Sequence, residues 1–147
     1  MPLIWRAMRA DGENPEVGRD AAALGVRVGD GENDDINPDG DGFVNPGIGG
    51  MSVSPSVDAF PVWRIPKRLR DKFPDRFPQA SGSNRLCCWW MGEGAFEAGP
   101  VADGLLLRLD PRRPERHGFV EPNGKMAVAD YQQALVNTRE QWNRWEV

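Results

Sequence analysis

The chain has 147 residues, with 18 lysines and arginines against 22 aspartates and glutamates, a net charge of −4 and a pI near 5.0. This length fits one domain, residues 1–147, that buries about two-thirds of its unfolded surface without disulfide staples. The acidic balance argues against whole-surface binding of nucleic acid or an anionic membrane, and the lack of a basic start followed by a long apolar run predicts a cytoplasmic protein without a conventional export signal.

The composition also restricts the fold class and the metal chemistry. Seventeen glycines and 13 prolines interrupt regular elements, which predicts an α+β protein of strands and loops with few helices. Cys87 and Cys88 are adjacent and rarely able to meet disulfide geometry, so we expect buried thiols in a reducing compartment. With a single histidine in the chain, we expect no structural metal site.

Residues 3–8 are predicted to form the first strand, because apolar side chains occupy most of both its faces. Arg6 shares one face of this strand with Ile4 and Met8. Two interpretations stay open for Arg6. It is either an edge-strand arginine whose head group reaches water, or an arginine that lines a pocket and binds a phosphate or carboxylate.

The alanine-rich segment 16–24 is predicted to form a short helix interrupted by Gly18. The glycine, aspartate and asparagine residues of segment 29–46 predict a long surface loop. Within this loop, residues 35–41 match the opening of a calcium-binding loop, with oxygens at its first, third and fifth positions and glycine at its sixth. Pro46 stands where the bidentate carboxylate should be, so a calcium site and a merely solvated acidic loop are both open.

Two adjacent glycines, Gly49 and Gly50, precede a strand-like segment in which Ser52 and Ser54 share one face. A glycine turn that leads into a strand edged with hydroxyls predicts a cradle for a small molecule, and an ordinary turn is the alternative. A serine hydrolase is disfavoured, because Ser54 replaces the last glycine of the G-x-S-x-G motif and Pro55 opposes a following helix.

A basic cluster is interleaved with aromatic residues between positions 63 and 77. Its members are Arg64, Lys67, Arg68, Arg70 and Lys72. Such a mixture is able to contact the phosphates and bases of a nucleic acid. Because Asp71 and Asp75 dilute the charge, the favoured interpretation is a solvated basic helical turn, and nucleic-acid binding through the cluster stays as the alternative.

Three further strands are predicted in the second half of the chain. Residues 86–91 form a continuous apolar run, which is typical of a central strand covered on both faces. Residues 105–109 form a leucine-rich strand, and residues 117–121 a short strand that ends at Pro122. His117 and Glu121 share a face of the last strand, where the ordinary alternatives are a structural histidine and a solvated strand-end glutamate.

The C-terminal segment has the clearest helical periodicity. Its apolar stripe steps by four and three residues and consists of Tyr131, Leu135, Thr138, Trp142 and Trp145. This spacing predicts an amphipathic C-terminal helix that packs on a sheet.

Three blocks of the chain resemble a family of bacterial toxins that are exported by type VI secretion and have an ADP-ribosyltransferase-like fold. The first block is Trp5-Arg6-Ala7, in the first strand. The second block comprises Asp41-Gly42-Phe43-Val44, Pro46 and Gly49-Gly50-x-Ser52-Val53. The third block comprises His117, Pro122, Met126, Leu135, Arg139 and Trp142. Because the blocks lie at the beginning, middle and end, the resemblance is to the whole domain, although residues 58–114 align poorly.

The resemblance implies a split mixed β-sheet that holds NAD in a cleft between its halves, with few helices and a C-terminal amphipathic helix. By position and residue type, it assigns catalysis to Ser52 and Glu121. The residues that it assigns to NAD binding are Arg6, Gly49, Gly50, Ser52, Ser54 and His117.

The implied function is that of an NAD-dependent toxin which acts inside a target cell. A carboxylate such as that of Glu121 would stabilise positive charge on the ribose as nicotinamide leaves. A protein or nucleic-acid acceptor gives ADP-ribosylation, whereas water gives NAD hydrolysis. The resemblance also implies delivery by a specialised secretion system and a cognate immunity protein. A non-catalytic interaction or calcium-binding module, based on the acidic loop, is the alternative class.

Overall fold

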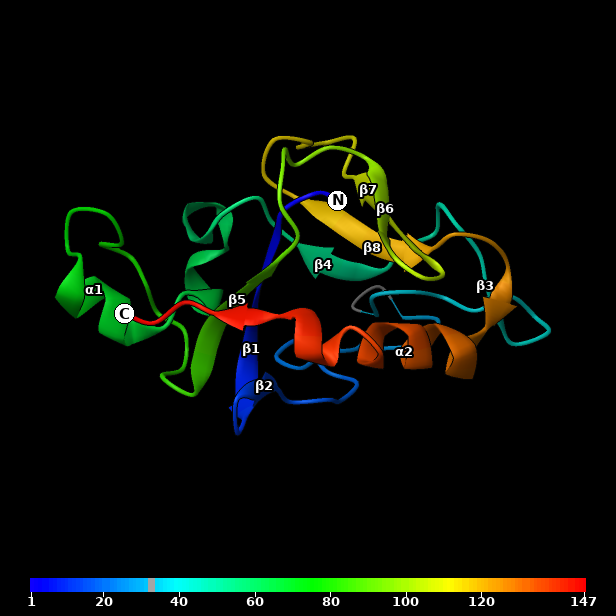
Figure 1. Ribbon diagram of the computed structural model, residues 1–147, viewed down its shortest axis with the longest axis horizontal. Coiled ribbons are helices and arrows are strands. Elements are labelled where there is room, and N and C mark those ends of the chain that lie inside the picture. Colours follow the sequence, from blue (N-terminus) through cyan, green and yellow to red (C-terminus); the bar gives the residue numbers. More distant parts are fainter. Residues whose placement is uncertain (32–33) are drawn as a thin grey trace.

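The computed structural model describes residues 1–31 and 34–147, and its strands form two four-stranded sheets and a smaller ladder. The first sheet has the order β10-β5-β1-β2, and all its neighbouring strands are antiparallel. Its strands are β1 (Ile4–Asp11), β2 (Asn14–Pro15), β5 (Leu86–Met91) and β10 (Asn143–Arg144). β1 and β5 pair along six residues each and cross the centre of the molecule in Figure 1.

The second sheet has the order β4-β8-β7-β6 and is also antiparallel. Its strands are β4 (Met51–Val53), β6 (Gly99–Ala102), β7 (Leu105–Leu109) and β8 (Gly118–Pro122). The smaller ladder pairs β3 (Phe43–Val44) with β9 (Met126–Ala127). The two large sheets meet at an antiparallel bridge between Trp5 and Ser54, whose backbone N–H groups donate to each other's carbonyls at 2.8 and 2.9 Å.

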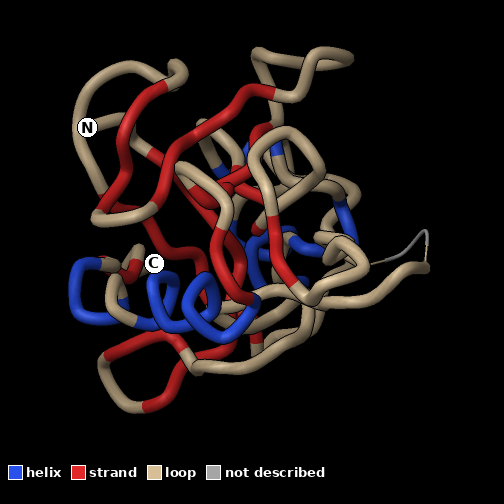
Figure 2. The backbone as a smooth tube through the Cα atoms, turned by 90° about the vertical axis from the view of Figure 1, so that its right-hand side faces the viewer, coloured by secondary structure: helices blue, strands red, loops and turns tan. Residues whose placement is uncertain are grey.

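The helices of the described residues are short, and much of the chain runs as loops between short strands (Figure 2). The α-helices are α1 (Lys67–Lys72) and α2 (Val128–Val136). Single 3₁₀ turns occur at η1 (Val57–Ala59), η2 (Val62–Arg64) and η3 (Arg139–Gln141). The predicted α+β class with few helices is confirmed. Within the described ranges, no helix has the length and hydropathy that a membrane span requires.

Two apolar clusters lie on opposite faces of the first sheet. The larger cluster contains Ile4 and Met8 of β1 together with residues of β7 and β8 and Tyr131 of α2. The Tyr131 hydroxyl donates to the Val120 carbonyl and accepts the Met51 N–H at 3.2 Å, which ties α2 to β4 and β8. The smaller cluster packs Ala7 and other residues of β1 and β5 against the segment that contains η1, η2 and α1.

The strand predictions in the second half are confirmed. β5 and β7 have the predicted bounds, and β8 begins and ends one residue later than predicted. The first strand is also confirmed, but it continues to Asp11.

The predicted helix over residues 16–24 is wrong. This segment forms turns and a parallel bridge between Val17 and Leu24. The Leu24 N–H, which a helix would bond to the Asp20 carbonyl, instead donates to the Glu16 carbonyl at 2.7 Å, and the Ala22 carbonyl accepts the backbone N–H of Arg9 at 2.8 Å. The segment is therefore held to β1 in an open conformation.

The predicted C-terminal helix is correct in position but too long. α2 ends at Val136, the hydroxyl of Thr138 donates to the Leu135 carbonyl at 2.7 Å, and after η3 the chain extends to pair with β5 as β10. Leu135, Thr138 and Trp142 are buried all the same, so the apolar stripe correctly identified core residues.

Candidate functional site

A cavity of about 230 Å³ lies beside the Trp5–Ser54 bridge, where β1 meets β4. β1 contributes residues 5–7 to its wall, and β4 with the following residue contributes residues 52–54. The rest of the wall comes from residues 59–61, Trp63, Arg64, Arg113, Arg116 and His117. The cavity thus brings together four of the residues that the sequence assigned to NAD binding: Arg6, Ser52, Ser54 and His117.

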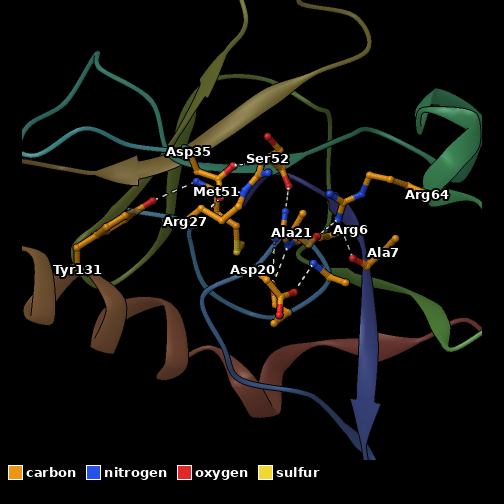
Figure 3. Close-up of polar contacts among 12 residues, drawn as sticks. Arg6, Ala7, Asp20, Ala21, Arg27, Asp35, Met51, Ser52, Arg64 and Tyr131 are labelled. Carbon is orange, nitrogen blue, oxygen red and sulfur yellow. Dashed lines mark hydrogen bonds and ion pairs between the residues drawn. The ribbon is translucent and has the colours of Figure 1, made fainter. Parts of the chain in front are cut away.

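Arg6 is only 3% exposed, and backbone carbonyls hold its guanidinium. Its Nη1 donates to the Ser52 carbonyl at 2.7 Å, and its Nη2 donates to the carbonyls of Ala23 at 3.0 Å and Ala21 at 3.3 Å (Figure 3). Arg6 therefore joins the 21–23 segment to β4. The interpretation of Arg6 as an edge-strand arginine that reaches water is wrong.

Arg64, the last residue of η2, also reaches this place (Figure 3). Its Nη2 donates to the Ala7 carbonyl at 2.9 Å and to the Ala21 carbonyl, which it shares with Arg6. Both hydrogen bonds of Arg64 within the described residues start at Nη2, and no buried side-chain polar atom there lacks a partner. Its Nε and Nη1 therefore have no hydrogen-bond partner there and are not fully sealed from solvent.

The two arginines have no direct counter-charge among residues 1–31 and 34–147, since neither forms an ion pair with a carboxylate there. Burial and then the charge of Arg64 lower the pKa of Arg6 to about 9, while Asp35 opposes the shift. Burial also lowers the pKa of Arg64. Asp35 is itself paired with Arg27 at 3.1 Å. Because buried charges in proteins are normally paired, this cavity is suited to an anion.

His117 brings an imidazole to the cavity wall, and its Nδ1 lies 2.9 Å from a carboxylate oxygen of buried Asp110. Burial lowers the pKa of His117 below its ordinary 6.5, against the opposing hydrogen bond to Asp110. This direction favours the neutral ring near pH 7, and the contact with the Asp110 carboxylate favours the tautomer that carries its proton on Nδ1 and leaves Nε2 as the acceptor. Sequence reasoning identified His117 but missed Asp110. The available signal was an aspartate placed directly between a predicted strand and Pro111.

Ser52 and Ser54 both line the cavity, as their alternation on one strand predicted. Within the described residues neither hydroxyl has a hydrogen-bond partner, and neither is sealed from solvent. Since no hydrogen bond joins either serine to His117 there, the geometry offers binding hydroxyls and no activated serine nucleophile.

Gly49 and Gly50 lie outside the cavity wall and have backbone φ values of +132° and +155°. A Cβ on Gly50 would lie 2.6 Å from the carbonyl oxygen of Val120, and a Cβ on Gly49 would lie 2.2 Å from that of Asp35. The two glycines allow close backbone contacts that position β4, and thereby the serines.

Glu121 also lies outside the wall and is 4% exposed. Its Oε2 accepts from Nε of Arg108 at 2.9 Å and from the Gly47 N–H at 2.8 Å. The carboxylate is thus committed to joining β7, β8 and the loop before β4.

The fold separates the five residues of the predicted basic cluster. Arg64 lines the cavity, and Arg68 donates to two backbone carbonyls of the 84–86 segment at 2.9 and 2.8 Å. The other three are exposed on α1: Lys67, Arg70 and Lys72.

The acidic loop contains no group of three potential metal ligands among its described residues, and residues 32 and 33 of the predicted loop lie outside them. Asp35 pairs with Arg27, while Oδ1 of Asp39 accepts the N–H groups of Asp41 at 2.9 Å and Phe43 at 3.0 Å. These carboxylates therefore have separate structural partners.

Sequence reasoning missed Trp63, Arg113 and Arg116 as cavity residues, because segments far apart in the chain place them there. No family model and no curated protein matches this chain.

Proposed function

We propose that this chain is an NAD-dependent toxin domain that transfers ADP-ribose from NAD to an intracellular target. The observation that carries the proposal is a pair of guanidiniums, those of buried Arg6 and partly buried Arg64, which line one cavity without a carboxylate partner among the described residues. The phosphates of a dinucleotide have the matching charge, and the planar donors of arginine suit their geometry.

The arrangement of the sheets supports the ADP-ribosyltransferase-like fold that the sequence resemblance implies. The arginine strand β1 and the serine strand β4 belong to different sheets and meet at one bridge. The cavity opens beside this bridge, where a split sheet would hold its dinucleotide.

The reaction would break the bond between nicotinamide and ribose in NAD, and positive charge would develop on the ribose as nicotinamide leaves. Nε and Nη1 of Arg64 would bind a phosphate next to the positive charge of Arg6, and the hydroxyls of Ser52 and Ser54 would orient the ribose and amide groups. Nε2 of His117 would accept the proton of the attacking acceptor, with Asp110 stabilising the resulting imidazolium. Glu121 has a supporting role in this scheme, because it lies outside the wall.

Water in place of a macromolecular acceptor would make the chain an NAD glycohydrolase toxin. The two activities share the cavity and differ in the product. Delivery into a target cell by type VI secretion, and neutralisation by a cognate immunity protein, belong to the same proposal.

The test is to incubate the purified protein with NAD that carries one label on nicotinamide and another on adenine, in the presence of a cell lysate. We expect free nicotinamide, with the adenine label on protein or nucleic acid. Free ADP-ribose alone would indicate hydrolysis, and release of no nicotinamide would overturn the proposal.

Arg64→Met should slow nicotinamide release by at least about 30-fold, because charge-assisted contacts to a desolvated anion contribute about 2 kcal/mol or more. Arg68→Met is the matched control. Arg68 also donates to two backbone carbonyls but does not line the cavity, so its variant should keep the activity. Equal losses in both variants would indicate a structural effect and contradict the proposed site.

A further inference from the structure

The cavity is smaller than the ligand proposed for it. Its volume is about 230 Å³, whereas pockets that bury most of a drug-sized ligand have about 300–1,000 Å³. NAD consists of two nucleotides joined through their phosphates. One nucleotide with its phosphate would occupy the cavity, and the other nucleotide with its phosphate would lie on the rim.

The rim has an exposed aromatic ring beside exposed guanidiniums. Trp63 lines the cavity and is nevertheless 68% exposed, directly before Arg64 on η2. Arg113 and Arg116, in the connection between β7 and β8, also line the cavity and are exposed. Among the described residues, the Arg116 side chain donates one hydrogen bond, to the Asp58 carbonyl at 3.4 Å, and its other N–H groups remain available.

This combination matches the chemistry of an adenine nucleotide. Any nucleobase can stack on an aromatic side chain, and nearby arginines bind the attached phosphate. The interior of the cavity, by contrast, presents hydroxyls and the imidazole of His117, which are suited to a ribose and to the reacting bond.

We propose that Trp63 stacks on the adenine of NAD and that Arg116 binds the adjoining phosphate, so that the adenylate half lies on the rim and the nicotinamide half lies in the cavity. This inference rests on the proposed function, because it takes NAD as the ligand. It adds an adenine-binding residue and the direction in which the dinucleotide lies.

The test measures binding of NAD and of AMP by calorimetry for the wild type and for Trp63→Ala, Trp63→Phe and Arg64→Met. Trp63→Ala should lower the affinity for both ligands by about 5- to 150-fold, the range expected for one stacked base. Trp63→Phe, which keeps an aromatic ring, should retain most of the affinity. Arg64→Met should weaken NAD more than AMP, because Arg64 faces the interior. Wild-type tryptophan fluorescence should be quenched by AMP, and Trp63→Phe should abolish the quenching.

Two neighbours provide matched controls. Val62→Ala changes an exposed residue of η2 outside the cavity wall, and Arg112→Ala removes a guanidinium from the same connection as Arg116 without changing the wall. Both should leave AMP affinity unchanged, whereas Arg116→Ala should lower it. Trp63 is exposed, so its alanine variant should keep the wild-type thermal transition.

The outcomes separate this inference from the proposed function. NAD binding that does not depend on Trp63 overturns the inference and leaves the proposed function standing. AMP binding that depends on Trp63, in a protein that does not bind NAD, supports the adenine site and overturns the proposed function. Binding of neither ligand overturns both.

Discussion

Replacing both Arg6 and Arg64 by methionine should destabilise the protein by more than the sum of the two single substitutions. Methionine keeps an unbranched apolar stem but removes the charge and the donors. Each single substitution relieves the repulsion between the two guanidiniums and leaves the shared Ala21 carbonyl with one side-chain donor. The double substitution relieves the same repulsion only once and leaves that carbonyl without a side-chain donor.

The expected excess follows from two contributions. Contacting residues couple by about 0.5–3 kcal/mol, and loss of the last partner of a carbonyl costs about 1–3 kcal/mol. Ala21 is only partly buried, so we expect an excess of about 2–4 kcal/mol. The single Arg6→Met change should cost less than the loss of its carbonyl contacts alone, because methionine avoids the burial and the repulsion from Arg64 that lower the pKa of Arg6 to about 9.

The assay is urea unfolding of the wild type, the two single variants and the double variant, followed by tryptophan fluorescence. Urea is uncharged and does not compete with the guanidinium groups. A second cycle with Arg6 and Arg68 is the control, because these residues share no acceptor, and it should be additive within about 0.5 kcal/mol. Additivity at that level for Arg6 and Arg64 would refute the reasoning.

Three further predictions concern residues around the cavity. Burial lowers the pKa of His117 below 6.5, so as the pH falls the unfolded chain binds this proton before the folded chain does. The free energy of unfolding should therefore decrease from about pH 6.5 downward. In a series of urea midpoints measured at different pH values, His117→Gln should remove this part of the decrease. Glu121→Gln should lower the free energy of unfolding by about 1–3 kcal/mol, because it weakens the contact with Arg108. If the variant were fully folded and released nicotinamide about 100-fold more slowly, Glu121 would instead be assigned to catalysis. Gly50→Ala should cost about 3 kcal/mol, because φ is +155° and the new methyl meets the β8 backbone, and an unchanged thermal transition would contradict this.

The strands that were predicted best from the sequence are those whose apolar side chains require burial. Residues 86–91 are apolar throughout, so they favour a position between other elements, and β5 indeed lies between β10 and β1. The leucines of 105–109 similarly favour a strand with a buried face, and Leu105 and Leu107 lie in the larger apolar cluster. Such runs need no distant partner to be recognised.

The C-terminal end of α2 depends on strand pairing with β5, which the local sequence does not show. The stripe from Tyr131 to Trp145 fits a continuous helix, but the free edge of β5 accepts the extended residues Asn143 and Arg144 as β10. Trp142 keeps its buried position because its indole N–H donates to the hydroxyl of Thr138 at 3.0 Å. A periodic stripe therefore identified the buried side and could not fix where the helix stops.

The failure of the helix prediction for residues 16–24 and the existence of the arginine-lined cavity have the same physical cause. In the open segment the carbonyls of Ala21 and Ala23 accept from Arg6, and Ala21 also accepts from Arg64. The helix propensity of residues 16–24 contains no information about Arg6 and Arg64, which belong to other segments of the chain. Because backbone carbonyls neutralise only part of two positive charges, the contacts that hold the open segment leave the cavity with an excess of positive charge, which a phosphate ligand would neutralise.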